Sequence, residues 1–278
     1  MGLRINTNVQ GLTAQNNLRA VRERLAKNFS HLSSGLRVAT ASDDAAGLAI
    51  GSRLSADIRS LNQAQRNAND GISLAQTADG AANEIGDILK RLKELVLQGK
   101  NGTVSNTDKD TLNTEFTDLI NEIDRIATVT TFSGVKLLDG TNSLITFQVG
   151  SGSTANDVIG LSLSDIDKTA LVLNALNISS GATSGQFDTA LSNVDTAINT
   201  VNTARGRFGA GQNRLASTIN NLGVNVQNLE AAKSRILDVD VAAETTDLTR
   251  NSIIQQAAIA ILAQANIQPQ VALQLLQG

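Results

Sequence analysis

The segment NSIIQQAAIAILAQANIQPQVALQLLQG, residues 251–278, contains no Lys, Arg, Asp or Glu. Its Ala, Leu and Gln residues favour a helix, and the run from Ile259 to Leu262 would cover every side of that helix with apolar side chains. A helix that is apolar all round must be buried on all sides. A membrane span needs roughly 20 consecutive apolar residues, and Gln and Asn interrupt this segment at shorter intervals. We therefore expect other copies of the chain to cover it, as in the subunit of an assembly.

The composition of the whole chain favours thin helical layers over a thick globular core. The 278 residues include six Phe but no Trp or Tyr, whereas an enzyme of this size normally fills its core with aromatic side chains. A single proline, Pro269, leaves helices almost uninterrupted. Cysteine is absent, which excludes disulfides, thiolate metal sites and cysteine nucleophiles.

Charge and the amino terminus restrict the partners and the route of export. A formal net charge of −3 argues against nucleic acid, because a nucleic-acid-binding surface favours a basic patch. Residues 1–8 contain one Arg among mostly polar residues, without the continuous apolar core of a cleaved secretory signal. We expect no membrane insertion, and a protein that either stays inside the cell or leaves it through a dedicated export machine.

Apolar residues at steps of three and four predict a helix over about residues 12–32. Its apolar seam passes through either Phe29 or Asn28. Gly35 is well placed to end it as a left-handed cap. The lone histidine, His31, lies beside this seam and is interpreted as a packing or surface residue rather than a general base.

Three further helices are expected. The first covers about residues 44–98, the second runs from the end of a loop at 99–106 to residue 128, and the third covers residues 191–236. Interior glycines weaken the first of these by about 1 kcal/mol each relative to Ala, so lateral packing must hold it. The last shows strict alternation of three and four over six heptads, which is typical of a coiled-coil seam. The phase breaks near Asp238, before the uncharged terminal helix.

A different pattern occupies the middle of the chain. Residues 130–138, 144–149 and 158–163 are predicted to be short strands, with Gly-rich turns between them. Residues 177–186 are small and polar, and we expect them to form an exposed tip.

The expected fold is mainly α, an elongated antiparallel bundle of long helices with coiled-coil packing. A small β-hairpin region lies at its far end, and both termini are paired as helices. We expect an inner domain of paired terminal helices, residues 1–44 and 237–278. The outer helical-bundle domain is then residues 45–236, with its hairpin region at about 129–165.

Segments at both ends of the chain closely resemble bacterial flagellins. They are Met1-Gly-Leu-Arg-Ile-Asn-Thr-Asn8, Leu32-Ser-Ser-Gly-Leu-Arg37, Asp43-Asp-Ala-Ala-Gly-Leu-Ala-Ile50, Asn69-Asp-Gly-Ile-Ser-Leu-Ala-Gln-Thr-Ala78, and Leu262-Ala-Gln-Ala-Asn266 with the Gln-Pro-Gln beyond it. The resemblance covers about residues 1–138 and 186–278. Between residues 144 and 186 the chain departs from the family, because the large variable outer domains of longer flagellins are missing.

The resemblance implies a structural subunit that self-assembles into the flagellar filament for motility. It implies secretion through the flagellar type III apparatus to the extracellular filament, without a cleaved signal peptide. The implied partners are further copies, an export chaperone at the carboxy terminus, and the filament cap and hook-junction proteins. The candidates for the polymerisation core are Phe29, Leu32, Leu248, Ile254, Ile261 and Leu262.

Two further surfaces follow from the resemblance. Flagellins detected by the vertebrate Toll-like flagellin receptor carry recognition residues that match Arg91, Leu95 and Glu115; the alternative is a solvated helix face with charge pairs at i,i+4. Sugars on bacterial flagellins are more often on Ser or Thr, which points to Ser179, Ser180, Thr183 and Ser184.

No catalytic, cofactor or metal motif is present, so an enzyme is the least favoured class. Two alternatives to a filament subunit remain. A hook–filament junction protein has similar ends, and polymerisation beyond a single ring would distinguish the two. A cytoplasmic coiled-coil scaffold would not need the uncharged terminal segment.

Overall fold

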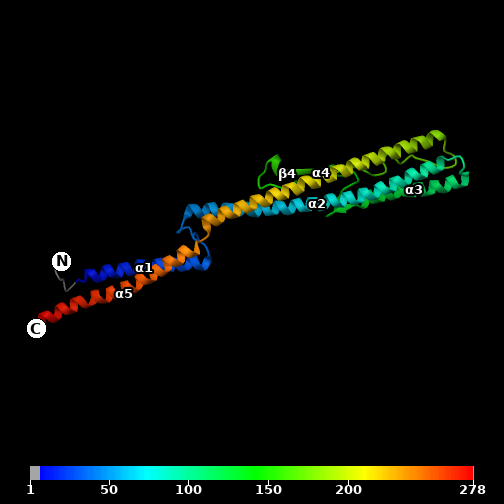
Figure 1. Cartoon of the computed structure of the whole chain (residues 1–278). Coiled ribbons are helices and arrows are strands. Elements are labelled where there is room, and N and C mark those ends of the chain that lie inside the picture. The colour runs from blue at the N-terminus through cyan, green and yellow to red at the C-terminus, as the bar shows by residue number, and fades with distance from the viewer. Residues whose placement is uncertain (1–6, 278) are drawn as a thin grey trace. The chain divides into compact units, whose positions relative to one another are not determined.

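The structure, a computed structural model, describes residues 7–277, without the side chains of residues 268–270 and 272–277. Five long helices dominate this part of the chain (Figure 1): α1 Val9–Ser34, α2 Ala45–Lys100, α3 Asn106–Val129, α4 Ser184–Leu237 and α5 Val241–Gln277. Four short strands complete it: β1 Thr131–Phe132, β2 Val135–Lys136, β3 Leu144–Gln148 and β4 Val158–Ser162. The predicted mainly α fold with a small β region is confirmed. Most of the Met1–Asn8 motif lies outside the described residues.

The chain divides into two compact units. One contains residues 57–227. The other contains residues 1–56 together with residues 228–278.

In the unit of residues 57–227, α2 and α4 pack as antiparallel neighbours. Lys93 Nζ lies 2.6 Å from Asp195 Oδ1, and Arg205 Nε donates to Asp79 Oδ1 at 2.8 Å. The residue numbers of the two contacts rise along α2, from 79 to 93, and fall along α4, from 205 to 195, so the two helices run in opposite directions. The core between α2, α3 and α4 is aliphatic with few aromatic side chains; its largest fully buried members include Ile85, Leu89, Leu92, Phe116, Ile123 and Phe208.

The buried stripe of α4 follows the predicted heptads at one of their two positions. Val194, Val201, Phe208, Leu215 and Leu222 are all buried, one heptad apart, as the periodicity predicts. At the other position the predicted seam residues are only half-buried, and their smaller preceding neighbours take the interior. These buried neighbours are Ala197, Ala204 and Gly211. The buried stripe of α4 is therefore wider than the seam of a strict coiled coil, which uses two positions per heptad. This width is typical of a helix in a close-packed bundle.

The interior glycines of α2 do not all serve one purpose. A Cβ added to Gly71 would lie 3.0 Å from Leu215 and 3.2 Å from Phe147. Glycine lowers the stability of a helix, so a packing reason is expected for it. At this position the reason is the close approach of Leu215 and Phe147, which a larger side chain would block. A Cβ at Gly80 would meet nothing within 4 Å.

The first predicted strand, residues 130–138, is wrong as a single element. β1 and β2 form an antiparallel hairpin instead, with Phe132 opposite Val135. Ser133 and Gly134 between them have φ of 49° and 81°. Two consecutive positive φ values are the requirement of a type I′ turn, and the Ser-Gly dipeptide is the signal that the strand prediction overlooked. β3 and β4 pair as a second antiparallel hairpin, from Leu144 opposite Ser162 to Gln148 opposite Val158.

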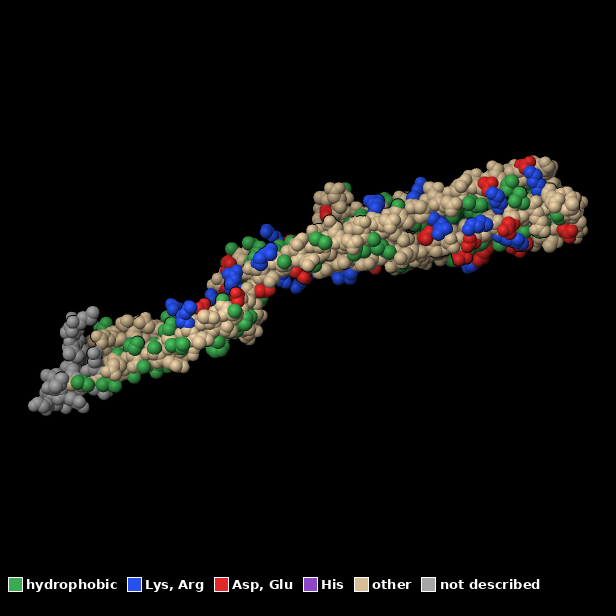
Figure 2. Space-filling view, viewed as in Figure 1, with side chains coloured by type: hydrophobic (Ala, Val, Ile, Leu, Met, Phe, Trp, Pro, Cys, Tyr) green, Lys and Arg blue, Asp and Glu red, His purple; other side chains and the backbone are tan. Residues whose placement is uncertain are grey.

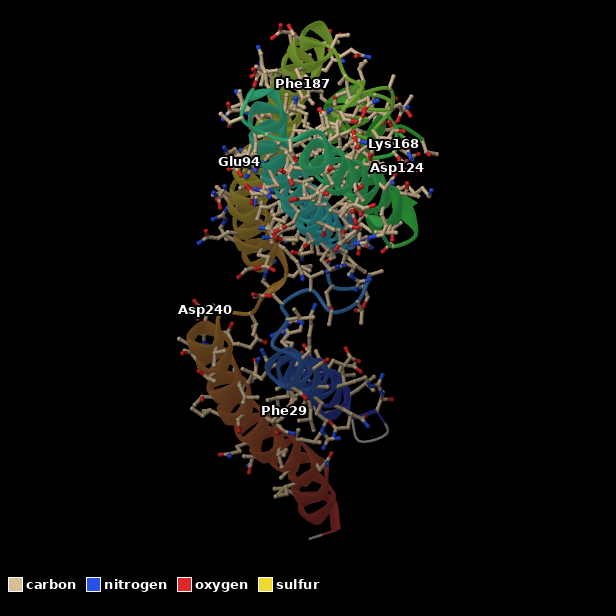
Figure 3. The ribbon with its side chains drawn as sticks, turned by 90° about the vertical axis from the view of Figure 1, so that its right-hand side faces the viewer. Phe29, Glu94, Asp124, Lys168, Phe187 and Asp240 are labelled. Atoms are coloured by element: carbon tan, nitrogen blue, oxygen red, sulfur yellow. The ribbon has the colours of Figure 1, made fainter. Side chains whose placement is uncertain are left out.

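The segment between β4 and α4 is more firmly packed than a free tip. Lys168 Nζ lies 3.1 Å from Asp124 Oδ2 on α3 (Figure 3). The fully buried Ile178 has its backbone N–H bonded to Asn113 Oδ1 at 2.9 Å. Most residues of the predicted tip, 177–186, are exposed. The prediction was wrong for Ile178, whose side chain fills the end of the core, and α4 already begins at Ser184.

In the other unit, a short joint links α1 to α2 beside the break between α4 and α5. Gly35 caps α1 at φ 72°, and its N–H donates to His31 O at 2.8 Å, as predicted. The next residue, Leu36, forms an isolated antiparallel bridge with Asp238. α4 ends at Leu237 and α5 begins at Val241, so the predicted break near Asp238 is confirmed.

Candidate assembly surface of the terminal helices

Helices α1 and α5 pair in antiparallel orientation. Near one end, Asn8 Nδ2 donates to Ala265 O at 2.9 Å, while Asn8 Oδ1 caps α1 by accepting from Gly11 N at 2.9 Å. Toward the other end, Asn251 Nδ2 donates to Asn28 Oδ1 at 2.9 Å. The buried face of α1 faces α5 at steps of three and four; it consists of Gly11, Ala14, Leu18, Val21, Leu25, Asn28 and His31.

A buried polar cluster interrupts this otherwise apolar face. Asn28 donates from Nδ2 to Glu244 Oε1 at 2.6 Å and accepts from Asn251. His31 Nδ1 lies 3.2 Å from the same Glu244 oxygen. His31 Nε2 is buried, has no hydrogen-bond partner among the described residues, and lies 3.7 Å from Asp43 Oδ1. The cluster thus joins α1, α5 and the joint after α1 through side chains that are mostly shielded from water.

Asp43 is held as a carboxylate at this cluster. Lys27 Nζ lies 3.0 Å from Asp43 Oδ1, and the backbone N–H and hydroxyl of Thr40 donate to Oδ2 at 3.0 and 2.9 Å. The lysine and then the two threonine donors hold the pKa of Asp43 well below its usual range. Asp44 has a different task, because its Oδ1 accepts from Gly47 N at 2.9 Å and caps the start of α2.

The alternative left open by the sequence, Phe29 or Asn28 in the seam, is resolved in favour of Asn28. Phe29 lies on α1 (Figure 3) with 60% of its surface exposed, whereas Asn28 is buried against α5. Both positions fit a three-four spacing, so periodicity could not separate them. The site formed by Asn28, Glu244 and Asn251 was not predicted from the sequence. The available signal was a polar residue, Asn28, at a position of the helix seam that is otherwise apolar.

Apolar side chains remain uncovered on α5. Among its residues with described side chains, only Asn251 and Ala265 are buried. Ile254 is 39% exposed and Ile261 is 61% exposed, and Leu248 and Leu262 are half-buried, as is Leu32 of α1. Figure 2 shows hydrophobic side chains along the visible face of this helix pair. Exposed apolar patches larger than those of an ordinary monomer surface usually mark interaction sites.

The charged face of the other unit contains two of the three residues matched to receptor recognition. Arg91 Nε donates to Glu115 Oε1 at 2.8 Å, and Arg91 Nη1 donates to Glu94 Oε2 at 3.2 Å. Both carboxylates raise the pKa of the guanidinium, Glu115 most. Leu95, by contrast, is fully buried. Its side chain belongs to the apolar core that α2 shares with α3 and α4 and is not presented to solvent.

The four hydroxyls proposed for glycosylation differ in their surroundings. Ser180 donates from N and Oγ to the two carboxylate oxygens of Asp110 at 2.8 and 3.1 Å. Those bonds, the backbone one first, lower the pKa of Asp110. Thr183 Oγ1 lies 3.2 Å from Gln186 Oε1. Ser179 is half-buried and Ser184 is exposed.

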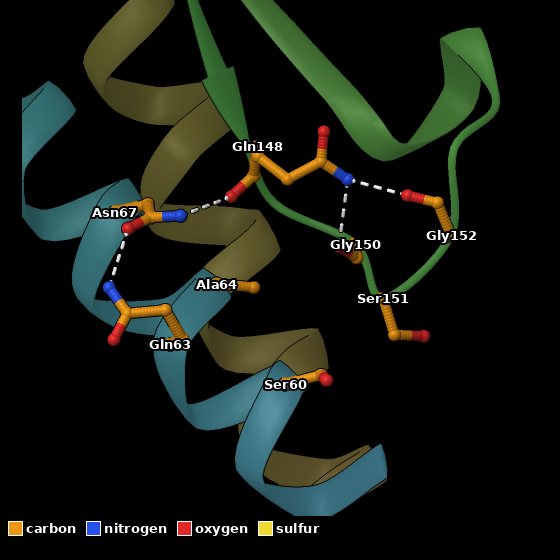
Figure 4. A pocket seen from close by; sticks show the side chains of 8 residues that line it. All are labelled: Ser60, Gln63, Ala64, Asn67, Gln148, Gly150, Ser151 and Gly152. Carbon is orange, nitrogen blue, oxygen red and sulfur yellow. Dashed lines mark hydrogen bonds between the residues drawn. The ribbon is translucent and has the colours of Figure 1, made fainter. Parts of the chain in front are cut away.

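A shallow hollow of about 300 Å³ lies between α2 and the loop after β3 (Figure 4). Amides line it: Gln63 Nε2 donates to Asn67 Oδ1 at 2.8 Å, Asn67 Nδ2 to Gln148 O at 2.9 Å, and Gln148 Nε2 to Gly152 O at 2.8 Å. Its lining contains no ionisable residue that could act as an acid or base or activate the hydroxyls of Ser60 and Ser151.

The described residues contain neither a metal cluster nor a membrane-spanning helix. No cluster of three or more His, Asp or Glu side chains there is arranged to hold a metal ion. No helix in the same part of the chain has the length and hydropathy to cross a membrane.

Comparison with known proteins places both halves of the chain in one family. The model of the bacterial flagellin N-terminal helical region matches residues 5–143, and that of the C-terminal helical region matches residues 191–276. The stretch that neither model matches overlaps the region where the sequence departs from the family motifs.

Relatives and a solved structure agree with this result. The flagellin of Halalkalibacterium halodurans is 44% identical over 98% of this chain and 99% of its own length. That of Bacillus subtilis is 43% identical over 99% and 100%. The crystal structure of Bacillus cereus flagellin is 35% identical, covers 60% of this chain and 94% of its own, and superposes with a TM-score of 0.50. The chain belongs to the bacterial flagellin family and is a structural subunit of the flagellar filament.

Proposed function

We propose that the uncovered apolar faces of α1 and α5 are the polymerisation core of this subunit. The single observation that carries the proposal is that α5 buries only Asn251 and Ala265 among its described side chains. Obligate interfaces are large and apolar, and contacts that do not close on themselves generate helical filaments rather than rings. The side chains we assign to this core are Phe29, Leu32, Leu248, Ile254, Ile261 and Leu262.

Within a filament, we assign residues 1–44 and 237–278 to an inner layer and residues 45–236 to an outer one. The apolar side chains of α5 support the inner assignment, because an environment of neighbouring subunits removes them from water. The charged pairs on α2 and α3, such as Arg91 with Glu115, support the outer assignment, because they are stable in contact with solvent.

Before assembly, the same apolar segment needs protection. An exposed apolar surface is an aggregation hazard, and a chaperone groove can hold an amphipathic helix by its apolar face. We propose that a flagellar export chaperone binds residues 253–276, of which the last side chains lie outside the described residues. Export then proceeds through the type III apparatus without a cleaved signal, toward the filament cap and hook-junction proteins.

Two surface roles are also proposed. The Arg91–Glu115 ion pair is exposed and is ordered by a hydrogen bond from Arg91 Nε to Glu115 and another from Arg91 Nη1 to Glu94. This arrangement suits recognition by the Toll-like flagellin receptor; Leu95 would act there only by supporting the helix. Among the hydroxyls proposed for glycosylation, Ser184 is the most accessible, because Ser180 and Thr183 already bond neighbouring side chains.

Electron microscopy of the purified full-length chain after seeding tests the function. We expect long helical filaments. Growth that stops after a single ring would identify a hook–filament junction protein instead, and failure to add to the seeds under any condition would favour the cytoplasmic scaffold.

A further inference from the structure

The loop between α2 and α3 contains the sole Asn-Gly dipeptide of the sequence, Asn101-Gly102. Both residues are exposed and lie outside the helices, since α2 ends at Lys100 and α3 begins at Asn106. A Cβ built on Gly102 would meet nothing within 4 Å. The backbone nitrogen of Gly102 is therefore not shielded by a side chain of its own or by packing around that position.

One hydrogen bond holds the Asn101 side chain over this peptide unit, and a second closes the backbone turn. Its Oδ1 accepts from Thr103 N at 3.3 Å, and its backbone carbonyl accepts from Val104 N at 3.2 Å. The contact with Thr103 places the side-chain carbonyl against the stretch of backbone that contains Gly102 N. A donor on Oδ1 also stabilises the negative charge that develops there when a nucleophile adds to Cγ.

We propose that Asn101 is a site of spontaneous deamidation. The Gly102 backbone nitrogen attacks Asn101 Cγ and loses its proton to water or hydroxide. The tetrahedral adduct collapses, the C–N bond of the side-chain amide breaks, and ammonia leaves with a proton taken from solvent. The resulting succinimide is opened by one water molecule at either carbonyl, which gives an aspartyl or an isoaspartyl residue. The net change is amide plus water to carboxylate plus ammonium.

The helices on either side are anchored independently of Asn101. Lys100 Nζ pairs with Asp188 on α4, and Ser105 caps α3 by accepting from Asp108 N at 3.2 Å. Conversion therefore leaves both helices in place and adds one negative charge before the amino-terminal end of α3, where the helix dipole favours it. In an extracellular filament, beyond cytoplasmic turnover, this charge accumulates with subunit age. That consequence rests on the filament function, whereas the chemistry does not.

A second asparagine before a small residue provides an internal comparison. Asn142 precedes Ser143, but its Nδ2 donates to Lys136 O at 3.2 Å and the residue is half-buried. The side-chain amide is thus tied to the β2 strand. Gly102 also carries no left-handed φ, so an alanine fits at that position and offers a matched variant in which only the access to the backbone nitrogen changes.

The experiment incubates the purified full-length chain at neutral and mildly alkaline pH and maps peptides by mass over several days. We expect the peptide with Asn101 to gain the mass difference between NH2 and OH, to yield isoaspartate, and to convert faster at the higher pH. Gly102→Ala should convert at least several-fold more slowly with an unchanged helical circular dichroism spectrum. The proposal would be overturned if Gly102→Ala converted at the wild-type rate, or if Asn142 converted as fast as Asn101. Neither result would contradict the proposed filament function, which electron microscopy tests separately.

Discussion

Asn251 of α5 donates a hydrogen bond to Asn28 of α1 over 2.9 Å, and both side chains are buried. Each amide fits only when the other lies opposite, so the pair fixes the register of the two helices in the way that a single buried asparagine does in a coiled coil. Glu244, which also accepts from Asn28, extends the match by two turns of α5. An apolar face without this cluster could slide by one turn at little cost.

Replacing Asn28 with Ala should weaken the α1–α5 pairing. The change leaves the buried Asn251 without its Asn28 partner and removes one of the two side chains that contact Glu244, which costs about 1–3 kcal/mol. Heat depolymerisation of filaments should therefore occur at a lower temperature. Asn225→Ala is the control, because Asn225 is exposed and its side chain bonds Asn221 on its own helix. Equal midpoints for the two variants would contradict a role for the cluster.

Acid should destabilise the joint after α1 through Asp43. The folded-state pKa of Asp43 is lowered by Lys27 and Thr40. Its stabilising effect is therefore fully present above the unfolded value, about 3.9, and is lost as the pH falls below that value toward the folded one. We expect filament stability to fall below about pH 4, and less steeply in Asp43→Asn.

His31 and Glu244 also face this cluster, so the difference between wild type and Asp43→Asn is the quantity to measure. Asp108→Asn provides the comparison, because Asp108 is an exposed acid on α3 far along the chain from the joint. Identical pH profiles for wild type and Asp43→Asn would show that Asp43 is not stabilised in the folded protein.

The sequence predicted the helices well and the polar contacts poorly, for a physical reason. Helix bounds follow from local spacing and caps, such as Gly35 and the break near Asp238. Which face of α1 is buried depends on α5, so the choice between Phe29 and Asn28 required residues more than two hundred positions away. Leu95 was likewise matched by motif, and only the packing of α2 with α3 shows that it is buried.

The terminal helices should be largely disordered in the dilute monomer and helical in the filament. Isolated helices gain little stability without packing, and α5 leaves most of its apolar side chains uncovered. Limited proteolysis of the monomer should trim residues 1 to about 35 and residues 240–278, and leave a core of about 45–235. Resistance of both ends in the monomer would refute the idea that they fold on assembly.

Deleting residues 251–278 should abolish chaperone binding and polymerisation together. The deletion removes the uncharged segment but none of the core of residues 57–227, so circular dichroism should still show a cooperative helical transition. Binding is measured by calorimetry with the purified export chaperone. An unchanged affinity after the deletion would place the chaperone site elsewhere on the chain.

A charge at Ile261 should prevent filament growth without unfolding the rest of the chain. Ile261 is 61% exposed in the single subunit and lies in the middle of the uncharged segment, which contains no acidic side chain to pair with a lysine. In the polymer we expect it to be removed from water, and burying an unpaired charge costs several kcal/mol. Every subunit would carry that cost. Ile261→Lys should therefore fail to extend seeds under conditions in which wild type grows.

Two variants make this result specific. Ile261→Leu keeps the apolar surface and should polymerise. Ser180→Lys places the same charge at an exposed residue beside Asp110, where solvent and the carboxylate accommodate it, and should also polymerise. If Ile261→Lys extends seeds as readily as Ser180→Lys, the exposed face of α5 remains in water within the filament, and the polymerisation core must be sought on another surface of the subunit.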